Sequence, residues 1–189
     1  MSKIPARPVI GVMGSAREGS SDGEEAQRLM SLAERLGQVL ADHNCVLVTG
    51  ATTGFPDTVS RAARARGGLT LGVSPAVSRR EHVSEYSLPD DAADVIIYTG
   101  FGLKGRNVIN VRTADIVIIF GGGIGTLNEF TIAYDEGKVI GVLEGTGGVA
   151  DRVKELAALS GKRDASEIIF ESSPEALIDK CLRVLDERD

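Results

Sequence analysis

A glycine-rich loop between a predicted strand and a predicted helix is the part of this chain best suited to chemistry. Residues 116–120 are all apolar and predict a buried strand of a parallel sheet. Glycine occupies positions 121, 122, 123 and 125, and an apolar-periodic helix is expected at 126–136. The free N–H groups of such a loop and the dipole of the following helix attract anions, most often phosphates. We therefore expect a phosphate to contact Gly122, Gly123, Gly125 and Thr126.

This loop differs from two familiar phosphate-binding loops. A P-loop requires Lys-Ser or Lys-Thr after its last glycine, whereas Gly125 is followed by Thr126 and Leu127. The dinucleotide-binding fingerprint requires a third glycine at position 126. A tight turn that needs glycine only for its backbone conformation is the alternative. Four glycines in five residues, followed by a threonine and a glutamate, favour an anion site over that alternative.

Two charged residues are candidates for catalysis. Glu129 falls in the first turn of the helix after the glycine loop, where a carboxylate beside a phosphate is unfavourable, so we expect it to contact a sugar or the reacting bond. Arg106 falls in the first turn of a helix expected at 104–113, with Asn110 one turn further on the same face, where we expect it to contact the ligand as well. The helix dipole disfavours an arginine there, which indicates a ligand or a carboxylate partner, and Glu129 is the candidate. An ordinary surface ion pair, worth under about 1 kcal/mol, remains the alternative for Arg106.

Strand and helix alternate along the whole chain with short connections. This pattern predicts an α/β fold, a single Rossmann-like domain over residues 1–189 with a doubly wound, mostly parallel sheet and helices on both faces. Residues 74–91 are expected to form a polar loop, with His82 solvated there rather than bound to a metal. The expected strands are 8–13, 45–49, 69–73, 95–98, 116–120, 139–143 and 167–170, and the expected helices are 24–42, 56–65, 104–113, 126–136, 149–159 and 174–186.

Glycine-rich loops follow the first, second, fifth and sixth predicted strands. The carboxyl ends of parallel strands share one edge of a sheet, and ligands of open α/β sheets bind there. We therefore expect four loops to converge on one pocket. They contain Gly14 and Ser15, Gly50 and Thr53, residues 121–126, and residues 145–148.

The composition excludes several classes of protein. The net charge of −6 leaves no basic excess to neutralise phosphates, so general nucleic-acid binding is not expected. The two cysteines, Cys45 and Cys181, are too few for a disulfide framework, and no zinc site or other metal site is predicted. No apolar run reaches the length of a membrane span, and no signal peptide is recognised at the start. We expect a cytoplasmic protein without membrane partners.

The two candidate segments together resemble the LOG family, once widely mislabelled as lysine decarboxylases. The family signature pairs Met-x-x-Arg-Lys with Pro-Gly-Gly-x-Gly-Thr-x-x-Glu. Residues 121–129 match the second part, with Gly121 replacing the proline, and Arg106 matches the arginine, with Asn107 replacing the lysine. Characterised LOG members are phosphoribohydrolases that cleave the N-glycosidic bond of adenine-type nucleoside 5′-monophosphates. The resemblance implies that Arg106 and Glu129 are the catalytic pair and that Gly122, Gly123, Gly125 and Thr126 hold the phosphate.

The two replacements are similar to a sister branch that includes molybdenum-cofactor carrier proteins. Two functions are therefore expected from the resemblance: nucleoside monophosphate hydrolysis, or carriage or sensing of a phosphate-bearing ligand such as a pterin cofactor. Hydrolysis requires no cofactor, and nothing in the sequence supports pyridoxal-phosphate decarboxylation. Apolar residues lie on more than one face of the helices at 104–113 and 126–136, and LOG-like proteins place the arginine helix near a two-fold interface, so we expect a homodimer or a dimer of dimers.

Overall fold

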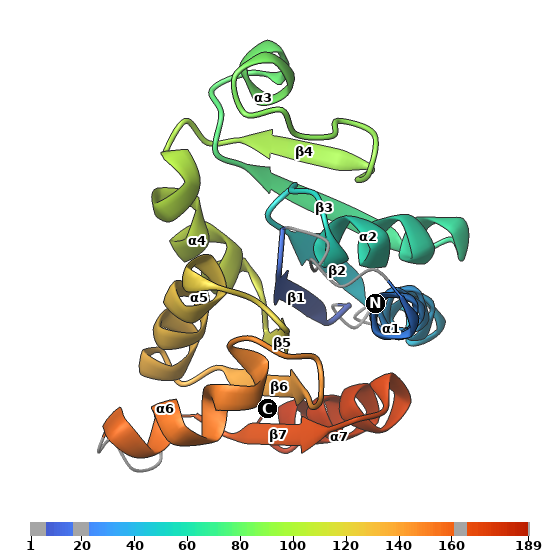
Figure 1. Ribbon diagram of the computed structural model, residues 1–189, viewed down its shortest axis with the longest axis vertical. Helices are drawn as coiled ribbons and strands as arrows, with labels where there is room; N and C mark the ends of the chain where they lie inside the picture. The colour runs from blue at the N-terminus through green and yellow to red at the C-terminus, as the bar shows by residue number, and fades with distance from the viewer. Residues whose placement is uncertain (1–6, 17–22, 161–165, 189) are drawn as a thin grey trace, which may run out of the picture.

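A seven-stranded sheet forms the centre of the protein in the computed structural model, which describes residues 7–16, 23–160 and 166–188. Every neighbouring pair of strands is parallel, and the order is β4-β3-β2-β1-β5-β6-β7 (Figure 1). The prediction of a doubly wound, mostly parallel α/β sheet is confirmed. The strands are β1 (Val9–Gly14), β2 (Val46–Thr49), β3 (Leu69–Ser74), β4 (Val95–Tyr98), β5 (Ile116–Phe120), β6 (Val139–Leu143) and β7 (Ile168–Glu171).

Helices cover both faces of the sheet. Figure 1 shows α1, α2 and α7 on one side and α4, α5 and α6 on the other, and the two apolar clusters of the core divide in the same way. No described helix is both long and apolar enough to cross a membrane. The helices are α1 (Glu24–Asp42), α2 (Phe55–Ala65), α3 (Arg79–Ser84), α4 (Gly102–Thr113), α5 (Ile124–Asp135), α6 (Val153–Ser160) and α7 (Pro174–Asp186), with a 3₁₀ turn η1 at Ala150–Arg152 before α6.

The central strand β5 explains why the core is divided between two faces. Side chains alternate along a strand, so Ile116, Ile118 and Phe120 pack under α1, α2 and α7, while Val117 and Ile119 pack under α4 and α5. All five side chains are fully buried. An uninterrupted apolar run is the pattern expected of a parallel strand covered on both faces.

The strand order reverses at β1, which lies between β2 and β5. Gly14 at the end of β1 is in register with Phe120 at the end of β5, so the loops that follow these strands leave the sheet at the same edge. The next helices along the chain, α1 after β1 and α5 after β5, lie on opposite faces of the sheet. A crevice at the carboxyl ends of the strands results, which is the usual ligand site of this architecture.

The segment at residues 74–91 differs from the predicted polar loop, because it contains α3. Ser78 caps this helix by accepting from the Glu81 N–H at 3.3 Å, a Ser-x-x-Glu pattern that marks helix starts. His82 is fully buried rather than solvated, with Nδ1 2.8 Å from Ser74 Oγ and Nε2 2.9 Å from the Pro89 carbonyl oxygen. These two hydrogen bonds compensate the loss of water around the imidazole, which is why a histidine is tolerated there.

Candidate functional site

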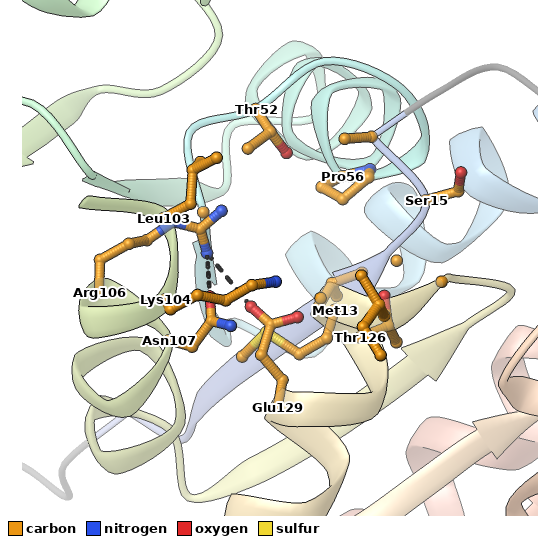
Figure 2. Close-up of a pocket in the computed structure, with 17 residues that line it drawn as sticks. Met13, Ser15, Thr52, Pro56, Leu103, Lys104, Arg106, Asn107, Thr126 and Glu129 are labelled. Atoms are coloured by element: carbon orange, nitrogen blue, oxygen red, sulfur yellow. Dashed lines mark hydrogen bonds and ion pairs between the residues drawn. The ribbon is translucent and has the colours of Figure 1, made fainter. Parts of the chain in front are cut away.

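One crevice at the carboxyl edge of the sheet collects most of the predicted site residues. A cavity of about 420 Å³ opens where β1, β2 and β5 end, within the size range of small-molecule sites. Figure 2 shows the side chains around it. The lining residues are Val12, Met13, Gly14, Ser15, Ala16, Gly50, Thr52, Pro56, Leu103, Lys104, Arg106, Asn107, Gly123, Ile124, Gly125, Thr126 and Glu129.

The glycine loop presents backbone N–H groups at the cavity wall. Helix α5 begins at Ile124, two residues before the predicted start, because Gly123 rather than a later residue is its N-cap. A glycine cannot cap the helix with a side chain, and within the described part of the chain the N–H groups of residues 122–126 reach no protein acceptor. Unsatisfied donors at a helix N-terminus form a site suited to an anion.

The loop after β6 supports the glycine loop from outside the cavity. The Thr146 hydroxyl accepts from the Gly121 N–H at 2.9 Å and donates to the Leu143 carbonyl at 2.6 Å. The Val149 N–H donates to the Gly122 carbonyl at 3.0 Å. Gly148 has φ +57°, and a Cβ on it would lie 2.2 Å from the Gly122 oxygen, so only glycine fits this contact. The prediction that residues 145–148 line the pocket is therefore wrong, because they hold the loop that does.

Arg106 and Glu129 form a buried ion pair that lines the same cavity. Arg106 Nη1 lies 3.2 Å from Glu129 Oε1, and each side chain is only 8% exposed, so the alternative of a surface ion pair does not apply. Asn107 accepts from the same Arg106 nitrogen at 3.2 Å and donates to Asn128 on α5 at 2.8 Å. Figure 2 shows the pair bridging the space between α4 and α5. The two helices thus position one charge each.

Gly50 and Asn110 determine where the Arg106 guanidinium lies. A Cβ on Gly50 would lie 2.3 Å from Arg106 Cζ, so any larger residue at the end of β2 would displace the guanidinium. The Asn110 amide is satisfied when its nitrogen donates to the Thr49 carbonyl at 3.1 Å and its oxygen accepts from the Gly50 N–H at 3.3 Å and from Arg106 Nη1 at 2.9 Å. Asn110, predicted as a ligand contact, lies behind the arginine and outside the cavity lining.

Burial governs the electrostatics of the ion pair. It raises the pKa of the Glu129 carboxyl above its usual range, and the positive charge of Arg106 opposes this effect. Burial lowers the pKa of Arg106 in the same way, and Glu129 opposes it. An arginine stays protonated at neutral pH even so. Arg106 Nε is buried without a hydrogen-bond partner among the described residues.

Several residues of the cavity were absent from the sequence prediction. Lys104 in the first turn of α4 extends toward Glu129 and the start of α5 (Figure 2). Leu103 and Ile124 flank the cavity with apolar side chains that are 49% and 74% exposed. Thr52 lines the cavity in place of the predicted Thr53. Exposed apolar residues at the first turn of a helix were the available signal for Leu103 and Ile124.

Thr53 and Gly122 are the remaining predicted residues that lie outside the lining. Thr53 is turned away and donates its hydroxyl to the Ala16 carbonyl at 2.6 Å, which ties the loop after β2 to the loop after β1. Gly122 is held against the loop after β6 by its carbonyl group. No cluster of three or more histidine, cysteine, aspartate or glutamate side chains that could hold a metal ion occurs within residues 7–16, 23–160 and 166–188.

Comparison with known proteins identifies relatives of two kinds. The chain is 33% identical over 110 residues to a cytokinin riboside 5′-monophosphate phosphoribohydrolase of Mycobacterium tuberculosis. The aligned region covers 58% of this chain and 56% of that relative. The structure is similar to a molybdenum cofactor binding protein from Rippkaea orientalis, with a TM-score of 0.75, 31% identity, and coverage of 95% of this chain and 98% of that chain. It is also similar to the molybdenum cofactor carrier protein of Chlamydomonas reinhardtii, with a TM-score of 0.72, 28% identity, and coverage of 96% and 99%.

The expected resemblance to the LOG family and its carrier branch is confirmed by these relatives. A model of the SLOG cluster4 family matches residues 7–178, which include every strand and both helices that carry the ion pair. This chain therefore belongs to the SLOG cluster4 family.

Proposed function

We propose that this protein binds a nucleoside 5′-monophosphate in the crevice and hydrolyses its N-glycosidic bond, releasing the base and ribose 5-phosphate. The observation that carries the proposal is the buried Arg106–Glu129 ion pair, which lines the same cavity as the unengaged N–H groups of the glycine loop. A phosphate site one helical turn from a carboxylate is the arrangement that a reaction on a ribose 5-phosphate needs.

The phosphate is assigned to the start of α5. Donors at residues 123–126 face the cavity, and the helix dipole adds positive potential at this point. Thr126 is 2% exposed. Its side chain packs against Gly122, because a Cβ on Gly122 would lie 2.3 Å from the Thr126 hydroxyl oxygen. Residues 123, 125 and 126 are accordingly the proposed phosphate contacts.

The ribose is assigned to the space between the phosphate site and Glu129. When the C1′–N bond breaks, its electron pair leaves with the base nitrogen, and positive charge develops on the sugar. The Glu129 carboxylate would stabilise that charge or orient the water whose oxygen bonds to C1′. Arg106 favours the ionised form of Glu129, and its guanidinium would contact the ligand from the cavity wall. Water is the only co-reactant that this reaction requires.

The base is assigned to the apolar part of the cavity. Leu103 from α4, Ile124 from α5 and Pro56 from α2 provide apolar surface around the opening. An aromatic ring placed there would cover apolar side chains that are otherwise exposed to water, which is favourable.

Carriage of a phosphate-bearing pterin is the second candidate function. Likeness to molybdenum cofactor binding and carrier proteins extends over at least 95% of the chain, whereas the alignment with the phosphoribohydrolase covers 58%. Asn107 also replaces the lysine of the hydrolase signature, and it anchors Arg106 instead of adding a charge. The same phosphate contacts would serve both functions, so the two proposals differ in the rest of the ligand and in whether a bond is broken.

Base release from AMP distinguishes the two functions. Purified protein is incubated with AMP, and separately with adenosine, and the products are separated by chromatography. We expect adenine and ribose 5-phosphate from AMP and little reaction with adenosine, which lacks the phosphate. If no nucleoside monophosphate yields a free base, the hydrolase proposal fails. Retention of a pterin phosphate in native mass spectrometry would then support the carrier.

A homodimer or a dimer of dimers is proposed for the assembly. Val108 on α4 and Ile132 on α5 border a shallow groove of about 240 Å³ on the outer side of these helices, away from the sheet. Both residues are only partly buried within one chain. A second subunit packed on this groove would bury them further.

A further inference from the structure

Lys104 has no function in the site as described so far, although it is one of the charged residues that line the cavity. Its side chain extends from the first turn of α4 across the cavity toward α5 (Figure 2). A Cβ on Gly125 would lie 3.8 Å from Lys104 Nζ, so the ammonium group is next to the first turn of α5. Within the described residues this ammonium group makes no hydrogen bond or ion pair.

The charge balance of the cavity makes an unpaired lysine there informative. Among the residues that the structure describes, the charged ones that line it are Lys104, Arg106 and Glu129, which together carry one net positive charge in a chain whose net charge is −6. Arg106 and Glu129 are already paired with each other. The dipole of α5 adds further positive potential where Lys104 ends. This combination suits a ligand group with two negative charges better than a neutral or singly charged group.

The burial of Arg106 is a second observation about this cavity. Arg106 is 7% exposed, and its Nε is buried without a hydrogen-bond partner in the described part of the chain. A buried donor without an acceptor is destabilising unless a partner supplies the acceptor. Lys104, Arg106 and the first residues of α5 therefore all line the same cavity.

We infer that Lys104 is a binding residue for the dianionic phosphate monoester of the ligand, and that it selects phosphorylated ligands over their unphosphorylated forms. The inference rests on the proposed phosphate site at the start of α5. The ammonium group donates to a phosphate oxygen while the backbone of residues 123–126 donates to the others. An ammonium–phosphate contact is charge-assisted, so its loss is costly for a phosphorylated ligand and has no consequence for a neutral one.

The alternative role for Lys104 is to offset the charge of Glu129. Lys104 lies close enough to lower the pKa of that carboxyl, although burial and Arg106 act on it more strongly. If this were its only role, removal of the lysine charge would alter the binding of AMP and adenosine equally, because both present the same ribose to Glu129.

Calorimetric titration of four proteins with three probes tests the inference. The proteins are wild type, Lys104→Met, Lys104→Arg and Lys180→Met, and the probes are inorganic phosphate, AMP and adenosine. Lys180 on α7 is a matched control, because it pairs with Glu171 at the end of β7, lies outside the cavity lining, and its loss changes the net charge equally. We expect Lys104→Met to weaken phosphate and AMP binding by roughly 10- to 100-fold and adenosine binding by less than twofold. Lys104→Arg should restore most of the loss, and Lys180→Met should match wild type.

The inference would be overturned if Lys104→Met weakened the binding of AMP and of adenosine equally. It would also be overturned if this variant bound phosphate and AMP as tightly as wild type. Failure of the proposed nucleotide function gives a different pattern, namely wild-type protein that binds phosphate but not AMP. In that case a loss of phosphate binding in Lys104→Met still supports the role of Lys104. Wild-type protein that binds neither phosphate nor AMP would refute both proposals.

Discussion

Replacement of Glu129 by glutamine tests the proposed chemistry most directly, because it keeps the shape of the side chain and removes its charge. The size of the effect depends on the surroundings of the carboxylate. A carboxylate about 4 Å from a unit positive charge gains about 1 kcal/mol in water, but about 4 kcal/mol at the effective dielectric constant of about 20 found in proteins. The Glu129 side chain is 8% exposed, so the second value applies. It corresponds to roughly three orders of magnitude in rate.

We therefore expect Glu129→Gln to lower base release from AMP by roughly 10²- to 10⁴-fold. AMP binding should persist or become tighter, because a negative charge near the phosphate is removed. Single-turnover base release, followed by chromatography, measures the rate, and calorimetric titration measures the affinity. A fall of only about fivefold would mean that Glu129 acts as if it were in water.

Glu136→Gln is the matched control for this experiment. Glu136 follows the same helix and also pairs with an arginine of α4, Arg112, at 2.8 Å, but this arginine is 67% exposed and Glu136 is outside the cavity lining. The control should match wild type in both assays. Wild-type turnover that Glu129→Gln leaves unchanged would refute the catalytic role of Glu129.

Three further results are expected. Burial raises the pKa of Glu129, so the folded protein favours the protonated carboxyl. The difference in free energy of unfolding between wild type and Glu129→Gln should therefore favour wild type most below about pH 4.3, and should shift against wild type as the pH rises through the raised pKa. A difference that stays constant in chemical denaturation from pH 4 to 8 would contradict this. Gly148→Ala should displace the Gly122 carbonyl and weaken AMP binding more than Gly147→Ala, since Gly147 also has a positive φ but open space around it; equal affinities in calorimetry would exclude the contact. Sedimentation velocity at micromolar concentration should give two or four times the mass of the chain, and Val108→Asp should shift it toward one chain; a wild-type monomer would refute the assembly.

The sequence was sufficient for the architecture and for the two charged residues of the candidate site. Apolar runs such as 116–120 and 139–143 correspond to β5 and β6 without any change of boundary, because a strand buried on both faces leaves little freedom in composition. The unusual position of Arg106 at a helix start indicated that it has a partner, and the structure places Glu129 there. Both the buried strands and the position of Arg106 could be predicted because they depend on interactions within one segment of the chain or on the order of the strands in the sheet.

Local features that involve a few hydrogen bonds were predicted less well. The Ser-x-x-Glu pattern at Ser78 was present in the sequence, yet the surrounding polar residues favoured a loop over α3. The buried state of His82 depends on Ser74 and Pro89, and nothing in the sequence around His82 indicates that these two hydrogen-bond partners converge on it. A polar residue can be buried wherever the tertiary structure supplies its partners.

Only the tertiary structure determined which residues of each loop face the cavity. Thr52 lines it and Thr53 does not, although the two are identical neighbours, because the turn after β2 directs one side chain inward and the other to Ala16. The same holds for residues 145–148, which support the glycine loop from outside. Gly50 is required because the Arg106 guanidinium lies against it, and Lys104 reaches Gly125 because α4 and α5 begin side by side. Sequence patterns report the average surroundings of a segment, whereas contacts of this kind depend on the relative position of separate helices and strands to within about an ångström.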